Sequence, residues 1–147
     1  MPTPSTSGTY AASLLQAALD GQVPVINRNT AAVASACGWM IARAAGTLTS
    51  GGNTTELLGA ALMLARADQQ EPAPDGRPDP AATVVWLVQQ EAAGRHELVD
   101  KILTTFLSTD LPAGAVIVTQ VTAHLLRLVD GPGAHATLRA MSGTNTR

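Results

Sequence analysis

The stretch Leu111–Asp130, LPAGAVIVTQVTAHLLRLVD, decides the fold that this sequence predicts. If the stretch is wound as a helix, its middle carries strongly polar side chains only at Gln120, His124 and Arg127. Their spacing of i, i+4 and i+7 places them in one narrow stripe. Every other direction presents Val, Ile and Leu or a small residue, and such a helix must be enclosed by neighbours. We therefore predict a central apolar helix at about 111–130.

Outward from that helix, apolar residues three and four positions apart predict further helices. They cover 9–19, 31–45, 54–67, 80–93 and 95–109, with a short terminal helix over 135–141. Asn29-Thr30 supplies a helix cap, Asp79-Pro80 a helix start, and Gly46 a helix end followed by a loop over 47–52. The predicted fold class is all-α, a compact bundle of six or seven helices.

Two segments, 84–88 and 116–122, are rich in β-branched residues, which also suit strands. A proline near the start of each surrounding helix and the Ala-rich flanks favour the helical interpretation. For 116–122 the choice between helix and strand stays open at this point.

The sequence is read as one helical domain over 1–147, because its length suits a single core. The sharpest change in composition is QQEPAPDGRPD, a Pro-rich linker loop that separates two helical halves. The parts in order are a flexible arm at 1–8, N-terminal helices at 9–68, the loop at 69–79, C-terminal helices at 80–142 and a frayed tail at 143–147.

The composition predicts association with another protein. Only 14% of the residues are charged, against about 25% in typical soluble domains, while 46% are hydrophobic. A surface made of small, weakly polar groups protects a monomer poorly from association, so we expect a homo-oligomer or a permanent protein partner. The net charge of −2 and the scattered basic residues argue against nucleic-acid binding.

Localisation is predicted from absent signals and from composition. The N-terminus has no basic and apolar leader, and no run of 18 residues is free of strong polarity, so we expect a cytoplasmic protein without membrane contact.

The single cysteine, Cys37, leaves no intrachain disulfide and no cysteine-based zinc site. The excess of Arg over Lys is typical of a GC-rich, bacterial genome. No cofactor is expected.

Trp39 and Trp86 are predicted interface anchors, because each lies off the main apolar face of its helix. An exposed tryptophan contributes a large contact area for little loss of side-chain freedom. The competing interpretation places both indoles in a second core layer of the bundle.

The stripe of Gln120, His124 and Arg127 has two interpretations. It would line a ligand pocket, with Arg43 as a further candidate, if Arg127 bound an anionic group and His124 titrated beside it. Otherwise it is the water-facing side of a partly exposed core helix.

Two further motifs resemble functional signatures without satisfying them. His96 and Asp100 share a helical face with the spacing of a zinc-protease motif, but an aspartate replaces the second histidine and no third ligand is near. Ion pairs of Glu91 with Arg95 and of Glu97 with Lys101 are the simpler account, so no metal site is predicted. Around 34–38, the Ala-x-x-x-Gly spacing of a helix-turn-helix lacks a basic recognition helix, which favours one continuous helix.

No nucleophile, base and acid stand in a catalytic pattern, and no glycine-rich loop is built to hold phosphate. The leading prediction is a non-enzymatic interaction or assembly protein that self-associates or docks on a protein partner through an Ala-rich, low-charge helical surface. The alternative is a small helical sensor or regulator whose pocket is lined by His124 and Arg127.

Overall fold

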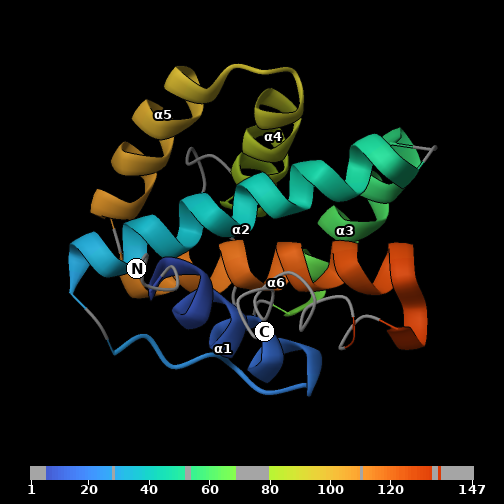
Figure 1. Ribbon diagram of the computed structural model, residues 1–147, viewed down its shortest axis with the longest axis horizontal. Helices are drawn as coiled ribbons and strands as arrows, with labels where there is room; N and C mark the ends of the chain where they lie inside the picture. The colour runs from blue at the N-terminus through green and yellow to red at the C-terminus, as the bar shows by residue number, and fades with distance from the viewer. Residues whose placement is uncertain are drawn as a thin grey trace, which may run out of the picture.

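The computed structural model describes residues 6–27, 29–51, 54–68, 80–109, 111–133 and 136. These residues form six α-helices and one 3₁₀ turn, and none of them lies in a strand (Figure 1). The elements are α1 Thr6–Leu19, α2 Thr30–Gly51, α3 Thr54–Asp68, α4 Pro80–Ala92, α5 His96–Thr109, α6 Leu111–Asp130 and η1 Gly131–Gly133. The predicted all-α fold class is confirmed, and the two β-branched segments lie within α4 and α6.

Helix α6 contacts each of the other five α-helices. It lies alongside α2, with α1 and α3 also against it, while α4 and α5 form a hairpin beyond α2 (Figure 1). The side chains of Val118, Val121, Leu125 and Leu126 are fully buried. Apolar residues on several sides of one helix are buried because neighbours cover those sides, as the composition of the stretch requires.

Helix α2 is longer than the sequence indicated. The predicted end at Gly46 and the predicted loop over 47–52 are wrong, because the helix continues to Gly51. Thr47 and Leu48 are buried in this continuation, and the Thr47 hydroxyl donates to the Ala44 carbonyl at 2.6 Å. Burial of a further helical turn outweighs the roughly 1 kcal/mol cost of a glycine within a helix.

Other helix ends follow the local signals. Gly21 has a φ of 81°, and the two hydrogen bonds from Gly21 N–H to Ala18 and from Gln22 N–H to Ala17 close a Schellman motif at the end of α1. Gly94, with a φ of 86°, ends α4 in the same way. At the start of α2, Asn29 Oδ1 accepts from the Ala32 N–H at 2.9 Å, as predicted for its cap.

Helix α1 begins at Thr6, within the arm that was predicted to be flexible over 1–8. The expected loop over 69–79 and the tail over 143–147 lie outside the described residues, as does the expected terminal helix over 135–141 apart from Ala136. The division into two halves around the loop therefore stays a prediction.

Two helices are long and apolar enough to cross a membrane, over Thr30–Leu48 of α2 and Leu111–Val129 of α6. In each window, 50% of the residues are buried inside the structure. The core helix of a soluble bundle meets the same criterion, so length and hydropathy do not separate the two cases.

Candidate functional site

Arg127 connects two helices that lie at opposite ends of the sequence. Its Nη2 donates to the carbonyl of Ala18 at 3.0 Å and also to the carbonyl of Leu19. These carbonyls belong to the last turn of α1, where intrahelical partners are missing and a cation is favoured. Arg127 therefore caps α1, and any anionic ligand would have to compete with these backbone acceptors.

The other two residues of the stripe differ in exposure. His124 is buried, with 9% of its surface exposed, and Gln120 is half-buried. The stripe is thus not an openly water-facing side of α6. Arg43, which the sequence named as a further candidate for this pocket, lies over the ring of Trp39. The pocket expected around His124 and Arg127 stays a prediction.

The two tryptophans occupy different environments. Trp39 is half-buried on α2 and packs against the core, and the guanidinium carbon of Arg43 lies 5.1 Å from the centroid of its ring. That distance is typical of a cation–π contact. Trp86 on α4 is 38% exposed. Of the two predicted anchors, Trp86 therefore offers more free surface to a partner.

Further large apolar side chains are exposed on α3, a helix that packs against α4. Met63 is 71% exposed and Leu64 is 42% exposed. These residues were not among the predicted anchors, although their helical spacing in the sequence indicates their exposure. Leu58, Ala61 and Ala65 form the buried face of α3, so Met63 is turned away from the core.

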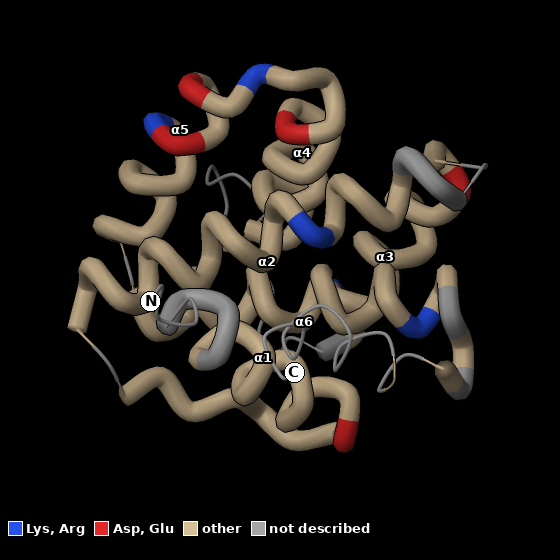
Figure 2. Tube along the Cα trace, in the orientation of Figure 1, with Lys and Arg blue, Asp and Glu red and all other residues tan. Residues whose placement is uncertain are grey.

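Charged residues gather where α4 meets α5, whereas most of the trace is uncharged (Figure 2). His96 Nδ1 lies 2.7 Å from Glu91 Oε2, and Arg95 donates to Gln90 Oε1 at 2.9 Å. The expected pair of Glu91 with Arg95 is replaced by these two contacts. Within the described ranges, no three His, Cys, Asp or Glu side chains are grouped to hold a metal ion.

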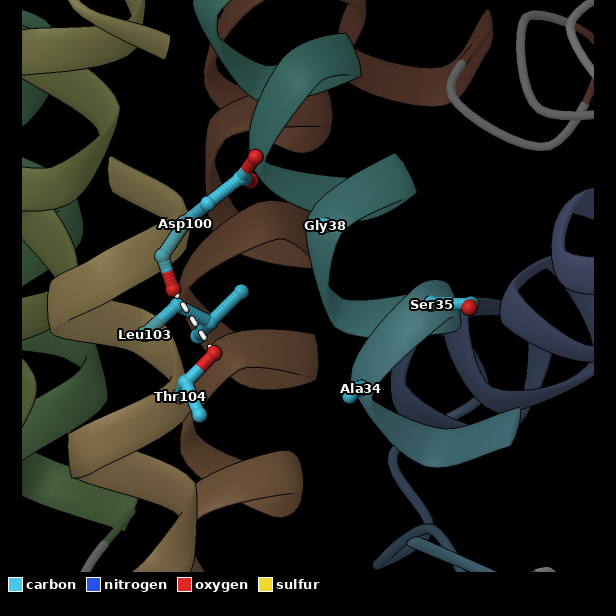
Figure 3. A pocket seen from close by; sticks show the side chains of 6 residues that line it. All are labelled: Ala34, Ser35, Gly38, Asp100, Leu103 and Thr104. Atoms are coloured by element: carbon cyan, nitrogen blue, oxygen red, sulfur yellow. Dashed lines mark hydrogen bonds between the residues drawn. The ribbon is translucent and has the colours of Figure 1, made fainter. Parts of the chain in front are cut away.

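A groove of about 370 Å³ lies between α2 and α5 (Figure 3). It is lined by Ala34, Ser35, Gly38, Asp100, Leu103 and Thr104. The Asp100 carboxylate extends toward α2, while the Ser35 hydroxyl points away from α5 (Figure 3). The Thr104 hydroxyl donates to the Asp100 carbonyl at 2.8 Å. The groove therefore presents one carboxylate above small side chains, without a base beside the serine.

The same part of α2 settles the arrangement around 34–38. One helix runs from Thr30 to Gly51 without a turn, so this segment is continuous as expected and does not form a helix-turn-helix. Its Cys37 is fully buried, and burial raises the pKa of the thiol from 9.0 to about 12. A thiol in that state is a small apolar group and a poor nucleophile.

Comparison of the chain with protein-family models, with curated proteins and with solved structures finds no match.

Proposed function

We propose that this protein is a non-enzymatic interaction or assembly protein that self-associates through its Ala-rich, low-charge helical surface. In this proposal the helices form one bundle with α6 at its centre. The observation that carries it is the exposure of large apolar side chains on α3 and α4, above all Met63 at 71% and Trp86 at 38%.

Exposed apolar area of this kind favours contact with another protein. Fully burying a Met or Leu side chain stabilises a complex by about 1.5–3 kcal/mol before the costs of association. An exposed Trp adds a rigid contact surface, and Trp is enriched among the residues that dominate binding energy. Leu64, at 42% exposed, extends the apolar surface along α3.

A second copy of the chain is the partner that the charges favour. Many of the charged residues lie at the α4–α5 corner (Figure 2), while α3 carries charges of both signs, with Glu56 in its first turn and Arg66 in its last. Two copies that approach antiparallel through α3 therefore bring the Glu56 end of one helix to the Arg66 end of the other, and the total net charge of −2 gives little long-range repulsion.

The test is sedimentation velocity over a wide range of protein concentration. We expect the sedimentation coefficient of the wild-type protein to rise with concentration. Met63→Glu places a carboxylate in the contact and is expected to weaken self-association by roughly tenfold or more. Ser13→Glu, which adds the same charge at an exposed position of α1, is the matched control and should leave the association unchanged.

A wild-type protein that sediments as a monomer at every concentration would overturn self-association. If the protein associates but Met63→Glu and Ser13→Glu behave alike, the contact does not involve α3. Circular dichroism of each variant at 222 nm, compared with the wild type, checks that the helices are intact.

A further inference from the structure

The connection between α1 and α2 contains an extended, uncharged segment, QVPVIN at 22–27, which runs along the outside of the helices (Figure 1). Exposure alternates along it: Val23 is 69% exposed, Pro24 is buried, Val25 is 72% exposed and Ile26 is half-buried. This period of two is that of a β-strand whose one face lies on the core. Pro24 and Ile26 therefore lie on the side of the segment that faces the core, and the side chains of Val23 and Val25 face solvent.

Among the residues that the structure describes, none supplies the backbone partners that a strand normally has to this segment. The hydrogen bonds that end α1 stop at the Gln22 N–H, and those that begin α2 start at the Asn29 carbonyl. Between described residues, no backbone hydrogen bond involves residues 23–27. Unpaired N–H and C=O groups beside exposed β-branched residues are the features of an open strand edge.

Pro24 determines which edge can pair. In an extended chain, the N–H and C=O of one residue point to one edge and those of the next residue point to the other. Pro24 has no N–H, so the edge shared by residues 22, 24 and 26 is one donor short. The opposite edge, formed by Val23, Val25 and Asn27, keeps all of its donors and acceptors.

We propose that this complete edge pairs, antiparallel, with the same segment of a second copy of the chain. A two-fold axis at Val25 places Val25 opposite its own counterpart and Val23 opposite Asn27, which allows about six backbone hydrogen bonds. The segment has no charged residue, so no like charges face each other across the axis. This inference rests on the proposed self-association and adds a contact separate from the helical surface.

The first test compares Val25→Pro with Val25→Thr by sedimentation velocity. Val25→Pro removes the central N–H while keeping an extended backbone, and should raise the dissociation constant of self-association by roughly tenfold or more. Val25→Thr keeps the N–H and the β-branched shape, so it should change the constant by less than about threefold. Unchanged helical circular dichroism of both variants checks the fold.

The second test is amide hydrogen exchange of the wild-type protein, followed by mass spectrometry at low and high protein concentration. We expect peptides containing Val23, Val25 and Asn27 to exchange fast in dilute solution and more slowly when the protein associates. Fast exchange at concentrations where the associated form dominates would overturn the strand pairing.

The outcomes separate this inference from the proposed function. If Met63→Glu weakens association and Val25→Pro does not, the strand pairing is overturned and the helical contact stands. A wild-type monomer at every concentration overturns both. Slow exchange that is independent of concentration in a monomer would mean that another part of the same chain covers the segment, which also overturns the pairing.

Discussion

The guanidinium of Arg127 donates to the carbonyl oxygen of Ala18 at 3.0 Å, across 109 positions of sequence. The same nitrogen also donates to Leu19. Helix α1 has no basic residue in its own last turn, so α6 supplies the cation that its carboxyl end favours. One side chain thus links the end of the first helix to the helix that contacts all the others.

Arg127→Ala should lower the free energy of unfolding by about 1–3 kcal/mol, because it removes hydrogen bonds from a charged donor to the α1 carbonyls. Urea unfolding followed by circular dichroism measures this loss. Arg43→Ala is the control, since Arg43 is exposed and its contact with Trp39 contributes about 0.5–1 kcal/mol. Equal losses in the free energy of unfolding for the two variants would show that the hydrogen bonds of Arg127 stabilise the protein no more than the Arg43–Trp39 contact does.

Gly46 and Gly114 should respond differently to an added side chain. A Cβ at Gly46 meets no atom within 4 Å, so Gly46→Ala should stabilise α2 by about 0.5–1 kcal/mol through helix propensity. At Gly114 a Cβ would lie 3.1 Å from Leu107 Cδ2 and 3.2 Å from Phe106 Cε2.

Gly114→Val should therefore destabilise the protein by about 1–3 kcal/mol through overpacking between α5 and α6. Thermal unfolding of both variants compares them directly. A melting temperature of Gly114→Val at or above that of the wild type would contradict the close approach of these helices.

Leu125 and Leu128 lie on the same helix with opposite degrees of burial. Leu125 is fully buried, so Leu125→Ala should cost about 2–5 kcal/mol. Leu128 is 38% exposed, and Leu128→Ala should cost clearly less. The free energies of unfolding in urea give both values, and a larger loss at Leu128 would mean that α6 packs in a different rotation.

Cys37 should make the stability fall at alkaline pH. Burial raises the pKa of its thiol from 9.0 to about 12, so between these values the unfolded chain ionises while the folded chain holds the proton. This contribution is fully present below pH 9 and is lost at about 1.4 kcal/mol per pH unit as the pH rises toward 12. Unfolding in urea at pH 8 to 10.5 should show a steeper decline for the wild type than for Cys37→Ala. Parallel declines would contradict the burial of the thiol.

The helices were predictable because their signals are local. The apolar circumference of 111–130 and the caps at Gly21, Asn29 and Gly94 act within one or two turns of the chain, and each is legible from neighbouring residues. The end of α2 was missed because Gly46 carries a local stop signal. Leu48 is buried beyond that signal, and neighbouring helices determine its burial.

The candidate sites were less predictable, because the surroundings of their side chains depend on helix packing and not on local signals. The sequence identified Trp39, Trp86 and the polar stripe as unusual, yet it could not distinguish a ligand-binding arginine from one that caps a helix. It also left Val25 without a role, because the burial of Pro24 and the exposure of Val25 depend on how the segment packs against the core.

The sequence by itself determined the all-helical class, most helix boundaries and the scarcity of charge, since these depend on residue type and on spacing over a few positions. Only the tertiary structure decided the partner of Arg127, the burial of His124 and the continuation of α2 beyond Gly46. Each of these depends on how helices that are distant in sequence pack together. That packing determines whether a side chain contacts a backbone carbonyl, another side chain or solvent.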